Sequence, residues 1–336
     1  MNRTIKHIVG CLVTLPMVAA GVHRLGFLTR PTGDNNTDNA FGQIDSFYSL
    51  PDNSLEVIVY GSSHAFKNVD PMAMYEAYGI GAYNYCWNWQ KINTTKLFIQ
   101  DSLRTQSPRV ALIETFYAGN VLKDVDMNGE IYYTRYLRDS QYRTQFLKQC
   151  FDRNLERWLS YYMPLAAFHD NWPNVNKKRF APVVNRHRYR MGYGPTQRVE
   201  PITFPDPSTV KTKQLDKSAL AELDEIVDIC RAHDIEIVFF TVPYEKGYAY
   251  GDAMAAYARE KGCAYINLFD HIEETGLDPL ADYQDKGHLN SSGAAKVGVY
   301  LGKYLSEHYA LTDMRQVEDN LWVRAQVEYE TRQNTL

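Results

Sequence analysis

The chain has 336 residues, of which 36 are basic and 40 acidic, and its formal net charge is −4. This mild balance gives no overall basic field of the kind that nucleic-acid-binding proteins carry, and a mean hydropathy of −0.42 is too low for a polytopic membrane protein. Hydrophobic residues make up 45% of the chain, which is enough to bury a large core and argues against disorder. The five cysteines are odd in number and widely spaced, so the sequence indicates neither a disulfide framework nor a zinc site.

An apolar run lies near the N-terminus, from Ile8 to Val22, between basic residues. Its 15 residues would span about 22 Å as a helix, short of the roughly 30 Å of a hydrocarbon core. Three interpretations remain open. Residues 1–29 form a cleaved signal peptide, with Val18 and Ala20 marking the cleavage site, or an uncleaved signal anchor, or an ordinary core helix, which the glycines and the proline of the run disfavour. The first two place the protein outside the cytoplasm, secreted or anchored to the cytoplasmic membrane.

The remainder of the chain alternates between strands and helices. Residues 30–54 are rich in small and polar residues without periodicity, which predicts a linker. Beyond it, β-rich runs are predicted over Leu55–Tyr60, Arg109–Glu114, Ile235–Val242 and Cys263–Asn267, and helices near 72–78, 90–105, 216–233, 252–261 and 292–308. The fold class is therefore α/β, with a parallel sheet that helices cover on both faces and that binds ligands at the carboxyl ends of its strands.

The middle of the predicted domain, 55–310, breaks this alternation. Residues 120–210 are expected to form an insertion or a lid, and residues 311–336 a C-terminal tail. Within the insertion, residues 131–198 hold 13 basic and 4 acidic side chains. Two interpretations of this charge are open: a surface for an anionic envelope polymer or a membrane, or a solvated structural insertion.

A serine turn follows the first predicted strand directly, in the sequence Gly61-Ser62-Ser63-His64. At the end of a strand, glycine permits a sharp turn, and a serine after it is presented at the edge of the sheet with free backbone N–H groups nearby. Near the other end of the domain, Asp285 precedes His288 by three residues. This spacing lets the carboxylate hold the Nδ1–H of the imidazole while Nε2 faces a distant nucleophile. Each motif alone also occurs by chance.

Together, in this order, the two motifs resemble blocks I and V of the SGNH (GDSL-like) hydrolases. The run from Ser54 to Phe116 is similar to a membrane-anchored bacterial branch related to the D-alanyl-transfer protein DltD and to polysaccharide O-acetylation proteins. The resemblance covers roughly half of the chain. It implies a three-layer α/β/α, flavodoxin-like fold with about five parallel strands. It also implies that Ser63 is the nucleophile, that His288 is the general base and acid, and that Asp285 orients His288.

The oxyanion hole departs from the family pattern. The family uses the N–H of the nucleophile, here Ser63, the N–H of a block II glycine, and a block III asparagine side chain. Trp89 stands in the place of the glycine, where its backbone N–H can still donate. Ala118 stands in the place of the asparagine, which leaves Asn120 or Asn88 as substitutes, or no side-chain donor at all.

Four further residues are candidates for substrate binding. His64 adjoins the nucleophile and Trp87 lies close to Trp89, while His169 and Trp172 fall in the insertion. For each of them an ordinary packing or surface role is the alternative. No metal ion and no organic cofactor is expected.

The resemblance implies a serine esterase or O-acyltransferase that works through an acyl-serine intermediate on small acyl esters, acetyl above all, of a cell-envelope glycan. Its expected partners are the ester-bearing glycan or an acyl donor, the membrane through the N-terminal segment, and a membrane-bound acyltransferase, but no nucleic acid. Two alternatives remain: a general carboxylesterase, and a catalytically weak scaffold or accessory protein of an envelope acyl-transfer system, which the altered oxyanion hole favours.

Overall fold

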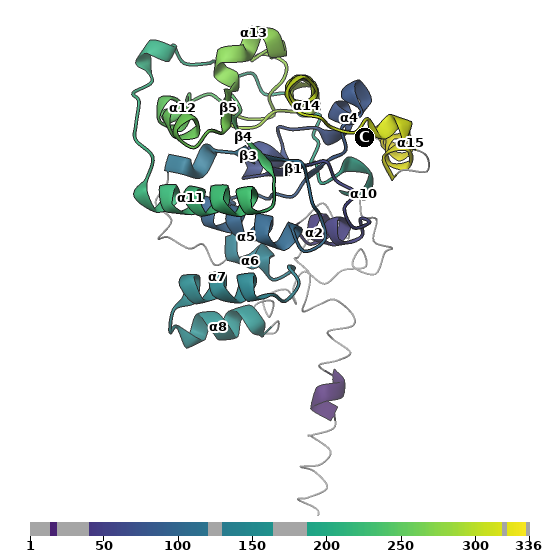
Figure 1. Ribbon diagram of the computed structural model, residues 1–336, viewed down its shortest axis with the longest axis vertical. Coiled ribbons are helices and arrows are strands. Elements are labelled where there is room, and N and C mark those ends of the chain that lie inside the picture. Colours follow the sequence, from purple (N-terminus) through teal and green to yellow (C-terminus); the bar gives the residue numbers. More distant parts are fainter. Residues whose placement is uncertain (1–13, 19–39, 120–129, 164–186, 318–320, 334–336) are drawn as a thin grey trace, which may run out of the picture. The chain divides into compact units, whose positions relative to one another are not determined.

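The computed structural model describes residues 14–18, 40–119, 130–163, 187–317 and 321–333 (Figure 1). The chain forms two compact units, a larger one of residues 38–147 and 185–336 and a smaller one of residues 1–37 and 148–184. Most of the predicted signal or anchor segment, 1–29, lies outside the described residues. In the part of the chain that is described, no helix is both long and apolar enough to cross a membrane. The domain boundaries proposed from the sequence stay predictions.

The larger unit is built on a five-stranded sheet in the order β2-β1-β3-β4-β5, and all its strands are parallel. The strands are β1 (Val57–Tyr60), β2 (Ala82–Asn84), β3 (Val110–Glu114), β4 (Glu236–Thr241) and β5 (Ala264–Asn267). Every residue of the first three strands is buried, as expected for a sheet that is covered on both faces. The predicted α/β class with about five parallel strands is confirmed.

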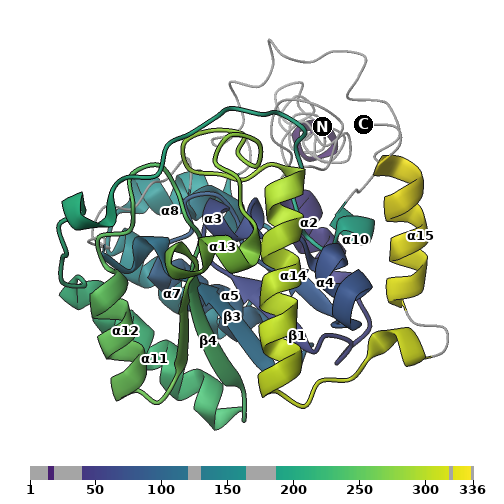
Figure 2. The same ribbon diagram turned by 90° about the horizontal axis from the view of Figure 1, so that it is seen from above.

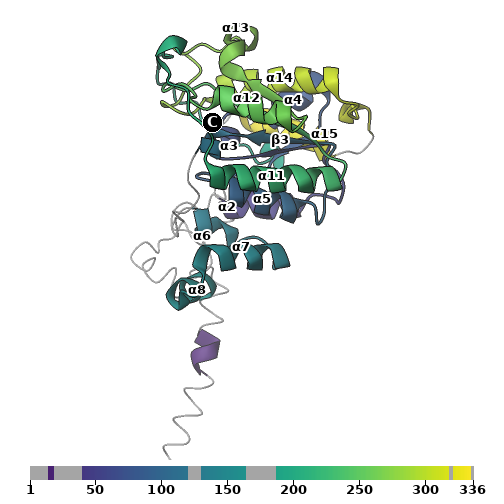
Figure 3. The ribbon, with the colours of Figure 1, turned by 60° about the vertical axis from the view of Figure 1, so that its left-hand side comes forward.

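Helices cover the sheet on both sides, which gives three layers (Figure 3). One layer holds α4 (Pro71–Tyr78), α12 (Gly251–Glu260) and α14 (Ser291–His308), and the other holds α2 (Ala40–Tyr48), α5 (Ile92–Ser102) and α11 (Lys217–Ala232). Helices α14 and α4 run side by side over the sheet (Figure 2). The five helices predicted from the sequence are present, with ends that differ by a few residues at most.

The remaining helices are short or lie outside these layers. They are α3 (Ser63–Phe66), α6 (Glu130–Thr134), α7 (Gln141–Phe151), α8 (Leu155–Tyr162), α10 (His187–Arg190), α13 (Ile272–Thr275), α15 (Leu321–Gln333) and the 3-10 helices η1 (Phe116–Gly119), η4 (Pro207–Thr209), η5 (Leu268–His271) and η6 (Met314–Gln316). In the smaller unit, the side chain of Asn154 caps α8, and Trp158 stacks on Tyr162 within that helix.

Helix α2 occupies part of the segment that was predicted to be a linker. Its Phe47 ring is fully buried and stacks on Tyr85 with 3.9 Å between ring centroids. The backbone oxygen of Gln43 accepts a hydrogen bond of 2.7 Å from Tyr83, a residue of strand β2. Residues 40–48 therefore form a helix whose apolar side chains Ala40, Ile44 and Phe47 are buried, although their polar composition predicted a linker.

Helix α15 lies in the segment that was predicted to be a tail. Trp322 is fully buried, and its ring stacks on Tyr75 of α4 with 5.7 Å between centroids. The hydroxyl of Tyr329 donates a hydrogen bond of 2.6 Å to Asp70, whose other carboxylate oxygen caps α4. Trp322 and Tyr329 therefore attach residues 321–333 to α4.

This packing leads to a stability prediction. Trp322→Ala is expected to lower the free energy of unfolding by about 3–5 kcal/mol, because it opens a cavity the size of a buried tryptophan. Urea unfolding followed by circular dichroism measures this. Val323→Ala, at a neighbouring position with 47% exposure, is the matched control and should change the same quantity by less than about 1 kcal/mol. Equal, small losses in both variants would contradict the docking of α15.

Candidate active site

The site begins at a sharp turn where strand β1 ends. Gly61 has a φ of +139°, a conformation that L-residues rarely adopt, and a Cβ at this position would lie 2.6 Å from the Cβ of Glu114. Ser62 then caps α3, since its hydroxyl accepts a hydrogen bond from the N–H of His64. Helix α3 starts at Ser63, whose N–H therefore has no acceptor within the helix. The turn presents Ser63 at the carboxyl edge of the sheet.

Three of the predicted residues form one hydrogen-bonded chain. The Oγ of Ser63 lies 2.8 Å from Nε2 of His288. On the other side of the ring, Nδ1 of His288 lies 2.9 and 3.0 Å from the two carboxylate oxygens of Asp285. All three residues are partly exposed, so that a substrate can reach them. The structure thus brings together two motifs that are 225 residues apart.

The Asp285 carboxylate is kept in its charged form. Partial burial raises its pKa, but hydrogen bonds from the His288 ring and from the N–H groups of Gly287 and His288 outweigh that effect and lower the pKa to about 2. A carboxylate that is ionised at neutral pH can stabilise an imidazolium at His288.

The loop that carries His288 is attached to the segment that follows α3. The N–H of Leu289 donates a hydrogen bond of 2.8 Å to the side-chain oxygen of Asn68, and the N–H of Gln284 donates one of 3.0 Å to the backbone oxygen of His288. Asn290, directly after this loop, caps α14 with its side chain. The separation of Ser63 and His288 is therefore fixed by backbone contacts as well as by the bond between their side chains.

Glu114, the last residue of β3, lies beneath the serine turn and was not among the predicted site residues. One of its carboxylate oxygens accepts hydrogen bonds from the hydroxyl of Ser62, at 2.7 Å, and from the N–H of Ser62, at 3.3 Å. The other oxygen accepts from the N–H of Phe116. Burial raises the pKa of Glu114 to about 7, although these hydrogen bonds act against it. The sequence feature that could have identified Glu114 is its position: it is an acidic residue that ends a run of apolar residues, at the edge of the sheet where ligands bind.

His64 packs against His288. Its buried ring stacks on Phe116 with 4.0 Å between centroids, meets the edge of Tyr244 at 5.3 Å, and lies 5.1 Å from the ring of His288. Burial, together with the nearby charge of His288, lowers the pKa of His64 to about 3. His64 is therefore neutral over the physiological range, and its contacts make it part of the wall that supports His288. Its substrate-binding role stays a prediction.

The block II segment forms a tight turn. The N–H of Gln90 donates to the backbone oxygen of Trp87, and the side-chain oxygen of Gln90 accepts from the N–H of Trp87. Within this turn Trp89 has a φ of +64°, in the left-handed region that favours glycine, and its side chain is 63% exposed. Trp89 therefore holds a backbone conformation that is typical of glycine.

Of the other predicted residues, the structure describes some and not others. Trp87 is half-buried and packs on Phe66 of α3 with 4.4 Å between ring centroids, and Asn88 is also half-buried. Asn120, His169 and Trp172 lie outside the described residues. Among the described residues, no group of three or more His, Cys, Asp or Glu side chains is arranged to hold a metal ion.

Comparisons with known proteins add little. No family model matches the chain, and no curated protein matches its sequence. Among solved structures, the chain is similar to a "putative acylhydrolase" from Bacteroides fragilis, with 10% sequence identity and a TM-score of 0.38 over 81% of this chain and 97% of that one. A likeness of this size carries no argument about activity.

The burial of Glu114 predicts a specific pH dependence. Between pH about 4.5 and about 7 the folded protein keeps a proton on Glu114 that the unfolded chain has lost, so this group makes the free energy of unfolding fall by about 3 kcal/mol over that range. Glu114→Gln removes the titration. The wild type should therefore lose stability relative to the variant as the pH rises. Paired urea titrations at several pH values measure it.

The matched control for this experiment is Glu236→Gln, because Glu236 is an exposed glutamate at the start of β4. The control should follow the wild type at every pH. A constant difference between wild type and Glu114→Gln across the range would show that Glu114 has the same pKa in the folded and unfolded chains.

The left-handed backbone at Trp89 predicts a stabilising substitution. Trp89→Gly is expected to raise the free energy of unfolding by about 1 kcal/mol, because glycine adopts this conformation without strain and little packing is lost from an exposed side chain. Thermal or urea unfolding measures the change. Trp87→Gly, in the same turn but half-buried, should instead be destabilising. A loss of stability in Trp89→Gly would mean that the indole makes contacts that outweigh the strain.

Proposed function

We propose that the protein is an SGNH-type serine esterase or O-acyltransferase that acts on small acyl esters, acetyl above all, of a cell-envelope glycan. The observation that supports this most is the continuous hydrogen-bonded chain from Ser63 through His288 to Asp285. A hydroxyl, an imidazole and a carboxylate in this order form the arrangement that activates a serine nucleophile.

The chemistry follows from the geometry. The Oγ of Ser63 attacks the acyl carbonyl while Nε2 of His288 takes its proton, and Asp285 holds the ring and stabilises the imidazolium. The N–H of Ser63 faces the developing oxyanion, with the N–H of Trp89 as the second donor. When the intermediate collapses, His288 returns the proton to the departing sugar oxygen, and an acyl-serine remains. Water or a second sugar hydroxyl then attacks it, which makes the reaction a hydrolysis or a transfer.

The envelope location belongs to the same proposal. It is supported by the apolar run from Ile8 to Val22, with basic residues on both sides, and by the resemblance of the Ser54–Phe116 segment to membrane-anchored envelope proteins. In this arrangement the N-terminal segment holds the protein on the outer side of the cytoplasmic membrane or directs its secretion. A membrane-bound acyltransferase supplies the acyl group in the transfer version of the reaction.

A second candidate is a catalytically weak scaffold within an acyl-transfer system. One observation favours it: Ala118, at the family's asparagine position, is buried in η1 and provides no side-chain donor. Loss of one oxyanion donor typically lowers the rate by about 10²–10³. A general carboxylesterase is the third candidate, and it shares the triad but not the glycan.

An active-site serine probe separates the enzyme from the scaffold. A fluorophosphonate should label the full chain, and Ser63→Ala should abolish the labelling, because the probe needs an activated serine. Ser292→Ala, at an exposed serine of α14, is the matched control and should label like wild type. Gel fluorescence and intact mass measure the adduct. Equal labelling of wild type and Ser63→Ala would refute Ser63 as the nucleophile.

Asp285→Asn extends the same experiment. The asparagine keeps an oxygen for the N–H groups of Gly287 and His288 but presents an amide to Nδ1, so the ring loses its productive tautomer. Turnover of an acetyl ester should fall by up to about 10⁴ with the fold retained. Unchanged turnover would exclude the triad, and a labelled but non-hydrolysing wild type would favour the scaffold.

A further inference from the structure

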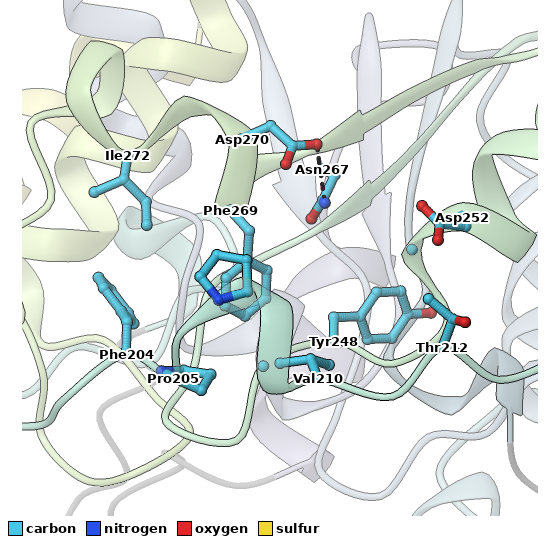
Figure 4. A pocket seen from close by; sticks show the side chains of 13 residues that line it. Phe204, Pro205, Val210, Thr212, Tyr248, Asp252, Asn267, Phe269, Asp270 and Ile272 are labelled. Atoms are coloured by element: carbon cyan, nitrogen blue, oxygen red, sulfur yellow. Dashed lines mark hydrogen bonds between the residues drawn. The ribbon is translucent and has the colours of Figure 1, made fainter.

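A cavity of about 340 Å³ lies beside the site, at the carboxyl edge of the sheet (Figure 4). Three separate segments line it: residues 204–212, residues 247–252 after β4, and residues 267–272 after β5. Its volume falls in the range of about 300–1,000 Å³ that small-molecule sites occupy. The cavity lies entirely within the larger unit.

The walls of this cavity combine aromatic rings with hydrogen-bond acceptors. Figure 4 shows Phe269 between Phe204 and Tyr248, with Asp270 and Asn267 above and Asp252 to one side. The amide of Asn267 donates a hydrogen bond of 3.0 Å to Asp270, which holds that carboxylate in place. Among the described residues that line the cavity there is no Lys, Arg or His.

This composition selects among ligands. Two carboxylates without a basic partner disfavour an anion, because like charges repel at short range. Asp252 and Asp270 are exposed, and a purely hydrocarbon occupant would displace water from these carboxylates without replacing its hydrogen bonds. An acetyl group is much smaller than the cavity. A neutral sugar fits both features, because its C–H face packs on an aromatic ring while its hydroxyls donate to carboxylate oxygens.

A single aromatic residue connects the cavity with the triad. The ring of Tyr244 lies 5.3 Å from that of His64 and 5.9 Å from that of Phe269, and His64 in turn packs against His288. The same loop is attached to the catalytic segments by its backbone, since the N–H of Glu245 donates to the oxygen of Lys286. Tyr244 therefore contacts both a residue that lines the cavity and the histidine that packs against His288.

We propose that this cavity is a subsite for a neutral sugar residue of the acylated glycan, which places the ester of a neighbouring residue at Ser63. The proposal rests on the proposed function and adds the class of substrate: an uncharged polysaccharide. Phe269 supplies the stacking surface, and Asp270 and Asp252 accept hydrogen bonds from hydroxyl groups.

Binding can be tested without turnover. On a Ser63→Ala background of the full chain, we expect calorimetry or NMR to show saturable binding of at least one of xylotetraose, mannotetraose and tetra-N-acetylchitotetraose. Phe269→Ala and Asp270→Asn, each added to that background, should weaken this binding about ten-fold, the effect of losing one stacking contact or one charged acceptor. Tyr300→Ala, in a different groove on α14, is the matched aromatic control and should bind like its parent.

Three results would overturn the subsite. The first is that none of the three sugars binds at concentrations up to about 10 mM. The second is that tetragalacturonate or decanoate binds more tightly than the neutral sugars do. The third is that the Asp270→Asn and parent proteins bind the sugar with equal affinity. A second measurement compares kcat/KM for an acetylated oligosaccharide with that for p-nitrophenyl acetate. In Asp270→Asn the ratio of the two should fall about ten-fold, and an unchanged ratio counts against the subsite.

The two proposals fail in different ways. Sugar binding without fluorophosphonate labelling of Ser63 would remove the esterase and leave a glycan-binding site. Labelling of Ser63 and hydrolysis of p-nitrophenyl acetate without sugar binding would keep the esterase and remove the subsite.

Discussion

The reversal of the chain at Gly61 is the constraint on which the rest of the site depends. Strand β1 is buried and ends against Glu114, and only a residue without a Cβ can turn there at a φ of +139°. The turn places Ser62 on the Glu114 carboxyl and Ser63 at the first position of α3. Because α3 leads to Asn68, which holds Leu289, the same turn also determines where His288 can lie. One backbone conformation thus fixes the positions of both Ser63 and His288.

Three titratable residues around this turn, Glu114, His64 and Asp285, have shifted pKa values: that of Glu114 is raised, and those of His64 and Asp285 are lowered. Burial raises the pKa of Glu114 to about 7, and burial together with the nearby His288 lowers that of His64 to about 3. Asp285 is less buried and receives several hydrogen bonds, which keep it charged. His288 therefore lies between a charged carboxylate, Asp285, on one side and the neutral ring of His64 on the other.

The sequence predicts those parts of the molecule whose signal is local. The β-rich runs and the longer helices show their periodicity directly, and Asp285 with His288 lies within four residues. That Ser63 meets His288 follows only when both are placed at the carboxyl edge of a parallel sheet. Strand β2 has three residues, too few for a periodic signal. Phe47, Trp322 and Glu114 owe their roles to tertiary contacts, and the cavity that Phe269 lines joins three distant segments, so no local pattern could have revealed them.

If the cavity holds a sugar as proposed, it bears on the choice between hydrolysis and transfer at Ser63. Ser63 and His288 are partly exposed, so water can reach an acyl-serine from solvent. A sugar hydroxyl competes with water only if it is held in place, and a well-oriented bound group can reach an effective concentration of about 10⁵–10⁸ M. A glycan residue anchored between Phe269 and Asp270 after the first alcohol has left would supply such a hydroxyl across the Tyr244 loop. An empty cavity would leave the acyl-serine to water. In the proposed reaction, the residence time of the sugar in this cavity, relative to the lifetime of the acyl-serine, would therefore decide between hydrolysis and transfer.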